Sequence, residues 1–175
     1  MKKTALAMAL LCMSHTGWGA PPTVAVNYRG ELVAEPCVIP PGEENIELDF
    51  GTVIDKYLYL NQRTAGKEFS IQLTECDLSL GETVSVSFSG TESVALPGLL
   101  AISSSGGASG IAIGLENVSG ELLPLNQPSG KLRLQEGSNR ITLKAYVRGE
   151  PEAINSKSIG RGQFTAVSTL SLNYD

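Results

Sequence analysis

The stretch Phe164-Thr-Ala-Val-Ser-Thr-Leu-Ser-Leu-Asn-Tyr174-Asp175 alternates apolar and polar side chains. One parity is an apolar row made of Phe164, Ala166, Leu170, Leu172 and Tyr174. Because successive side chains of a strand point to opposite faces of a sheet, this alternation predicts a half-buried strand, which we place over 162–174. The sequence ends in that strand, one residue after a large aromatic, so we expect the strand to be paired or left as an open edge.

A second alternating stretch lies near the other end of the chain, over 24–34. Its row consists of Val24, Val26, Tyr28, Gly30, Leu32 and Ala34, and it precedes Cys37. A chain with one strand to donate and one unpaired strand edge could assemble head to tail with its neighbours.

Short apolar runs and turn signals alternate between these two stretches. Turn-forming residues such as Pro40-Pro41-Gly42 and Gln127-Pro128-Ser129-Gly130 separate the runs. The expected strands are 24–34, 46–53, 67–76, 83–89, 99–103, 110–116, 121–125, 131–135, 139–148 and 162–174. Even spacing of short strands predicts an antiparallel β-sandwich of immunoglobulin-like type. The stretch 150–159 has some helical character, but Pro151, Asn155 and Ser156 favour a loop there.

Residues 1–19 have the pattern of a secretory signal peptide. Lys2 and Lys3 give a positive start, an apolar run follows, and small residues lead to Gly19. We expect cleavage between Gly19 and Ala20. No later segment has the run of about 18 apolar residues that a membrane-spanning helix needs.

The expected mature chain has 156 residues (175 − 19), which fits one domain. Without Lys2 and Lys3 it has 11 basic and 18 acidic residues, a net charge of −7, which argues against nucleic-acid partners. Cys12 leaves with the signal, so Cys37 and Cys76 remain, and an even pair in an exported chain predicts a disulfide. The alternative is two free buried thiols. These features indicate a bacterial periplasm or cell surface.

The sequence gives little support for catalysis. The single histidine, His15, lies in the signal peptide, so the mature chain can form no Ser-His or Cys-His pair. No cluster has the spacing of metal ligands, and we expect no cofactor and no metal. Glu43 and Glu44 are a possible pair of acid and base, but a solvated acidic turn explains them better. We therefore expect that the protein is not an enzyme.

Several motifs together resemble chaperone–usher fimbrial subunits, or pilins. They are Tyr28-Arg-Gly-Glu-Leu32 with Pro36-Cys37, Gly110-Ile-Ala-Ile-Gly-Leu115, and Gly162-Gln-Phe-Thr-Ala166 with the row that follows. The resemblance covers the whole chain. Gly90-Thr-Glu, Ala95-Leu-Pro-Gly98 and Pro151-Glu-Ala153 are similar to minor subunits of P-type pili, in particular the adaptor that joins the tip fibrillum to the rod.

The resemblance implies an incomplete immunoglobulin-like sandwich that lacks its final strand. It divides the chain into a signal peptide (1–19), a donor-strand extension (20–35) and a pilin domain (36–175). The missing strand leaves a groove, and a strand from a chaperone or a neighbouring subunit completes it. The implied groove edge is Phe164, Ala166, Leu170, Leu172, Tyr174 and Asp175, and the implied donor row is Val26, Tyr28, Gly30, Leu32 and Ala34.

The resemblance also implies the partners and the location. The partners are a periplasmic pilus chaperone, an outer-membrane usher and neighbouring pilin subunits, and the chain passes through the periplasm into a fimbrium on the bacterial cell surface. The implied function is a structural minor subunit, an adaptor, involved in cell adhesion. Two alternatives stay open: a major or tip-fibrillum pilin of the same family, and a secreted carbohydrate-binding β-sandwich.

Overall fold

The computed structural model describes residues 24–175. The expected signal peptide, with Cys12 and His15, lies outside these residues, as does the start of the expected extension. The chain divides into two units, residues 1–32 and residues 33–175, and each is described by itself. No helix in the described part of the chain is both long and apolar enough to cross a membrane.

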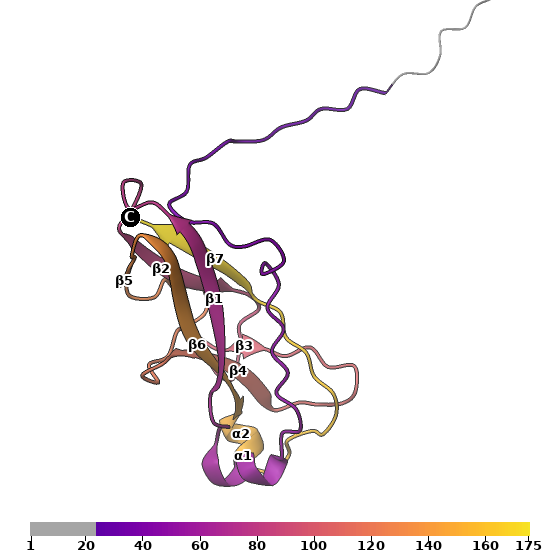
Figure 1. The fold of residues 1–175 in the computed structure, drawn as a ribbon. Helices are drawn as coiled ribbons and strands as arrows, with labels where there is room; N and C mark the ends of the chain where they lie inside the picture. Colours follow the sequence, from indigo (N-terminus) through magenta and orange to yellow (C-terminus); the bar gives the residue numbers. More distant parts are fainter. Residues whose placement is uncertain (1–23) are drawn as a thin grey trace, which may run out of the picture. The chain divides into compact units, whose positions relative to one another are not determined.

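Residues 33–175 form two antiparallel sheets (Figure 1). The four-stranded sheet has the order β1 (Lys67–Cys76), β6 (Gly137–Gly149), β4 (Ile111–Asn117) and β3 (Leu100–Ala101). The three-stranded sheet has the order β5 (Leu132–Arg133), β2 (Thr83–Ser89) and β7 (Thr169–Tyr174). The immunoglobulin-like sandwich expected from the spacing of short strands is confirmed.

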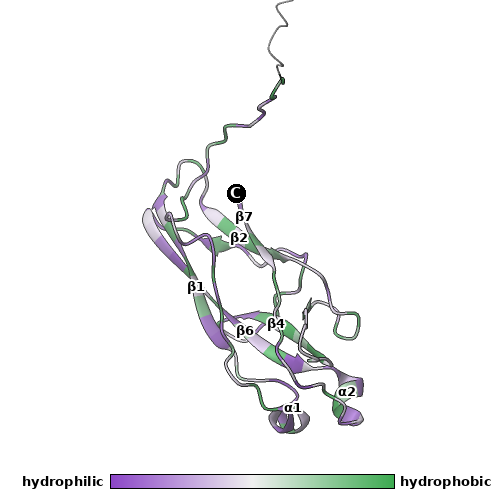
Figure 2. Ribbon diagram, turned by 90° about the vertical axis from the view of Figure 1, so that its right-hand side faces the viewer, coloured by the Kyte–Doolittle hydropathy of each residue, from purple (hydrophilic) through white to green (hydrophobic). Residues whose placement is uncertain are grey.

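Alternating side chains explain why these segments form sheets. In β1, Ile71 and Leu73 are buried, and Ile71 lies opposite Ile141 of β6 in the register. In β2, Val84, Val86 and Phe88 are buried on the inner face. The rings of Phe69 and Phe88 meet edge to face across the two sheets, with their centroids 6.3 Å apart. Hydrophobic segments recur along β1, β2 and β4, which enclose the core between the sheets (Figure 2).

The local predictions fail at the segments that lack a strand partner. Residues 46–53 and 121–125 form no strand, although Leu122 makes an isolated bridge with Glu116. Residues 24–34 form no strand in this single chain either, and their expected role as a donor strand, which needs another subunit as partner, stays a prediction. The expected last strand, 162–174, is paired as β7 only from Thr169, with a separate bridge between Ser103 and Thr165.

The structure contains two short helices where the sequence predicted none. The loop expected over 150–159 contains α2 (Pro151–Asn155), with a proline in its first turn. Proline suits the start of a helix, because its fixed φ is already helical. A backbone N–H in the first turn has no acceptor within the helix, so proline loses no hydrogen bond by lacking one. The other helix, α1 (Asp55–Asn61), was not predicted at all; its Leu58 is buried in the core.

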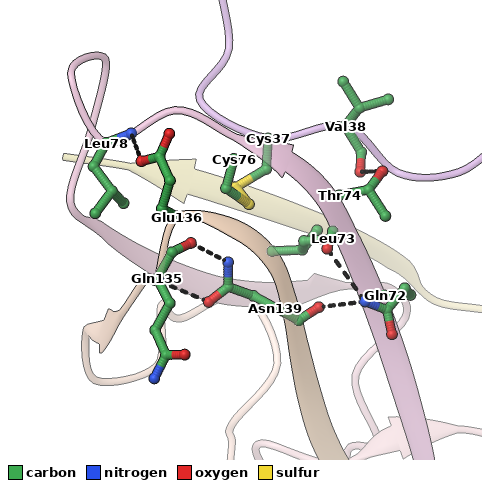
Figure 3. Close-up of a disulfide and its surroundings, with 10 residues drawn as sticks. All are labelled: Cys37, Val38, Gln72, Leu73, Thr74, Cys76, Leu78, Gln135, Glu136 and Asn139. Carbon is green, nitrogen blue, oxygen red and sulfur yellow. Dashed lines mark hydrogen bonds between the residues drawn. A yellow bond between two sulfur atoms is a disulfide. The ribbon is translucent and has the colours of Figure 1, made fainter.

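The disulfide joins the start of the domain to the end of β1 (Figure 3). The Sγ atoms of Cys37 and Cys76 are 2.13 Å apart. Next to it, Val38 and Thr74 exchange two backbone hydrogen bonds of 2.9 and 2.8 Å. The predicted disulfide is confirmed, and the alternative of two free thiols is wrong.

Candidate strand-acceptor groove

The strand β7 has one paired edge and one open edge. It pairs with β2 in an antiparallel register that runs from Val84–Tyr174 to Ser89–Thr169. Among residues 24–175, no strand pairs with the other edge of β7. An open edge presents a row of backbone N–H and C=O groups that can pair with another chain.

Beside this open edge lies a row of apolar side chains that are only half covered. From Phe164 to Tyr174, every even-numbered residue is half-buried and every odd-numbered residue is exposed. The apolar members of the row pack against the core; they are Phe164, Ala166, Leu170, Leu172 and Tyr174. The partner strand β2, in contrast, buries its inward side chains almost completely. The row therefore has packing partners on one side only.

The segment before α1 provides the opposite wall. A cleft of about 570 Å³ separates residues 33–39 from β7, and its lining includes Val33, Ile39, Leu170 and Leu172. Further along, the rings of Phe50 and Phe164 lie 6.4 Å apart. No backbone ladder pairs residues 44–53 with another strand of the described chain. We call the space between residues 36–53 and residues 164–174 the acceptor groove.

Polar contacts mark both ends of the acceptor groove. At the Phe164 end, Arg161 donates two hydrogen bonds of 2.9 and 2.6 Å to the carboxylate of Asp55, and these bonds lower the pKa of Asp55. At the Tyr174 end, the carbonyl of Asp175 accepts hydrogen bonds of 2.9 and 3.0 Å from the backbone N–H groups of Glu82 and Thr83. Burial, followed by the charge of Glu35, raises the pKa of Tyr174.

The expected donor row is exposed along its described length. Val26, Tyr28 and Leu32 are exposed, and none of residues 24–32 belongs to a strand or bridge. A Cβ atom added at Gly30 would meet nothing within 4 Å. A row of large apolar side chains that is open to water is typical of a surface that another chain covers.

The comparison with known families identifies the chain. The family model described as "Fimbrial protein" matches residues 26–175. The chain belongs to the fimbrial protein family. The resemblance to fimbrial subunits expected from the motifs is thereby confirmed, and the family consists of structural subunits of surface fimbriae rather than of enzymes.

Similar proteins agree with this assignment. The fimbrial adapter PapK of Escherichia coli is 31% identical to this fimbrial subunit, over 95% of this chain and 96% of the relative. A minor fimbrial subunit of Proteus mirabilis, PmfF, is 28% identical, over 99% of this chain and 100% of the relative. Among solved structures, the P pilus rod subunit PapA has the same fold, with a TM-score of 0.69 at 21% identity; the match covers 81% of this chain and 100% of PapA.

One wall of the groove could be predicted from the sequence of this fimbrial subunit, and the other could not. The row on 164–174 was predicted because apolar and polar residues alternate along it. The apolar residues of the facing wall, Ile39, Leu48 and Phe50, were not assigned to the groove. The alternation of Leu48 and Phe50 was visible, but it was interpreted only as part of an ordinary strand over 46–53.

The groove has the properties of a binding surface for an extended peptide. It combines unpaired backbone groups with an alternating apolar floor, which is how β-strand addition obtains affinity and specificity. No group of three potential metal ligands occurs in residues 24–175.

Proposed function

We propose that the chain is a minor adaptor subunit of a chaperone–usher pilus, which joins its neighbours by strand insertion. The observation that carries this proposal is the open edge of β7 together with the half-buried row on 164–174. Residues 20–35 act as the donor extension, and residues 36–175 form the pilin domain that accepts a strand from another protein.

The donor and acceptor rows are compatible in length. The acceptor row spans ten residue steps, or about 34 Å, and the five donor side chains span eight steps, or about 27 Å. All neighbouring strands in the two sheets are antiparallel, so the inserted strand runs antiparallel to β7. Its Ala34 then lies near Phe164 of the acceptor, and its Val26 lies near Leu172.

Burial of the donor row supplies the driving force. Tyr28 and Leu32 are exposed before insertion, and burying each side chain contributes about 1.5–3 kcal/mol. Glycine at position 30 is the smallest residue of the row, so the pocket that receives it is shallow. A chaperone strand fills the same groove in the periplasm, and an outer-membrane usher brings the two subunits together.

The adaptor assignment rests on the relatives that match along their full lengths. Both PapK and the minor subunit of Proteus mirabilis align with at least 95% of this chain. A major rod subunit is the second candidate, because the rod subunit PapA has the same fold. Counting subunits in purified fimbriae separates the two: an adaptor is present in one or a few copies per fibre, whereas a rod subunit forms most of the mass.

The donor role is tested by two tryptophan substitutions on opposite parities. Gly30→Trp overfills the shallow pocket, so we expect the variant to fold and reach the periplasm but to be absent from fimbriae. The matched control, Glu31→Trp, adds the same side chain on the solvent-facing parity and should be incorporated. Quantitative immunoblotting of purified fimbriae measures both. Equal incorporation of the two variants would contradict the assigned register.

Measurements on an isolated subunit need a filled groove. A form completed in cis carries a copy of residues 24–34 after Asp175, joined through a short flexible linker. The copy starts at the Tyr174 end and runs antiparallel to β7, as the proposed donor does. We call this molecule the completed form.

A further inference from the structure

The short helix α1 exposes apolar side chains on one face. Tyr57 and Leu60 are three residues apart, which places them on the same side of the helix, and they are 47% and 84% exposed. Ile54, three residues before Tyr57, is 59% exposed. Leu58 is buried and anchors the opposite side. We call Ile54, Tyr57 and Leu60 the α1 patch.

The α1 patch lies at one end of the acceptor groove. Asp55, the first residue of α1, accepts a hydrogen bond from Arg161. Arg161 lies three residues before Phe164, the first residue of the apolar row. The helices α1 and α2 lie together at the end of the domain that is opposite the C-terminus (Figure 1). The Phe164 end of the groove and the α1 patch are therefore neighbouring parts of one surface.

A short connection forces a second subunit toward this surface. This step rests on the proposed function, in which the last donor side chain, Ala34, lies near Phe164 of the acceptor. Only Glu35 separates Ala34 from Pro36, where the donor's own domain begins. Two residue steps span at most about 7 Å, so the donor's domain must start immediately beyond the groove.

The part of the domain that surrounds Pro36 also exposes an apolar side chain. The carbonyl of Pro36 accepts a hydrogen bond of 2.8 Å from the N–H of Asp77. A Cβ atom added at Gly81 would lie 2.9 Å from Cγ of Pro36, so the turn over 77–82 packs closely on this residue. Leu80, in the same turn, is 53% exposed.

We propose that the α1 patch is a second contact between successive subunits, outside the groove. It docks against the turn that corresponds to residues 77–82 in the fimbrial subunit whose donor strand fills the groove, and the 77–82 turn of this chain docks in the same way on the subunit that receives its donor strand. The one-residue connection brings the two surfaces together, and both present aliphatic or aromatic side chains. Each junction then has two parts: an inserted strand, and an end-to-end contact that limits bending at Glu35.

Thiol labelling tests this contact, because both cysteines of the pilin domain are in the disulfide. Single variants Leu60→Cys and Leu80→Cys report the two sides of the proposed contact. Val26→Cys reports strand insertion alone, since it lies at the far end of the donor row. Val94→Cys, at a side chain 99% exposed, is the control for general shielding by the fibre. Labelling rates with a maleimide are compared between the periplasmic subunit and purified fimbriae.

We expect Leu60→Cys, Leu80→Cys and Val26→Cys to react at least about tenfold more slowly in fimbriae, with Val94→Cys nearly unchanged, because a thiol reacts only when it is accessible. Protection at position 26 with free labelling at 60 or 80 would overturn the end-to-end contact and leave the donor role intact. Free labelling at position 26 would overturn the donor role itself. Equal protection at 60, 80 and 94 would mean general shielding and would also overturn the proposal.

Discussion

Among single residues, the most consequential contact is the ion pair of Arg63 with Glu116. Glu116 is 4% exposed and accepts two hydrogen bonds from Arg63, both 2.8 Å long, which raise the pKa of Arg63. The guanidinium also lies 3.6 Å from the ring centroid of Tyr146. Arg63→Ala leaves a buried carboxylate without its partner, but the Arg63 side chain is 37% exposed and water screens the pair, so we expect the completed form to lose about 2 kcal/mol of unfolding free energy.

The control for Arg63→Ala is Lys131→Ala, at an ion pair that is exposed on both sides. Lys131 lies 3.3 Å from the carboxylate of Asp175, and exposed pairs contribute about 1 kcal/mol or less. Urea denaturation of both variants measures the difference. A similar loss in the two variants would show that the burial of Glu116 gives its ion pair no additional weight.

Gly114 provides a second prediction at the scale of one residue. A Cβ atom at this position would lie 2.2 Å from Cζ of Tyr146, its register partner on β6. Gly114→Ala must displace that ring, and such overpacking costs about 1–3 kcal/mol. Gly130→Ala, where a Cβ atom meets nothing within 4 Å, should be nearly neutral. The thermal midpoints of the two completed variants test this, and equal midpoints would contradict the close packing.

At the scale of elements, the disulfide compensates for the weak pairing of the segment before α1. Residues 44–53 join no sheet in the described chain, whereas Cys37 is fixed to Cys76 at the end of β1. The bridge closes a loop of 39 residues, for which chain entropy predicts about 4 kcal/mol of stabilisation. Replacing both cysteines by serine in the completed form should therefore lower the urea midpoint strongly. A change equivalent to less than about 1 kcal/mol would mean that the segment is held by its packing alone.

At the scale of the whole molecule, the domain is a sandwich with one strand position open. We expect the domain from Pro36 onward to aggregate or be degraded when it is made alone, because its groove and strand edge stay exposed. The completed form should be monomeric and unfold cooperatively. Size-exclusion chromatography and urea denaturation compare the two proteins.

The informative control for the completed form carries Gly30→Trp only in the appended copy. Its linker and length are unchanged, so a failure to stabilise the domain would be due to the register of the inserted strand. If the domain alone unfolded like the completed form, the incomplete-fold interpretation would be wrong.

Features that depend on local geometry can be predicted from the amino-acid sequence alone. The parity of a strand is a property of consecutive residues, so the row on 164–174 and the row on 24–34 could be identified without a structure. The disulfide followed from the number of cysteines in an exported chain. The order of short strands and turns was sufficient to predict the sandwich.

Which alternating segments have a partner depends on the three-dimensional fold. Residues 46–53 and 169–174 have similar patterns, but the former forms no strand and the latter pairs with β2. Pairing depends on backbone groups far away in the sequence, as does the contact between Arg63 and Glu116, which are 53 positions apart. The facing wall of the groove and the α1 patch belong to the same class: each exists because the fold brings distant segments together, and no local pattern contains that information.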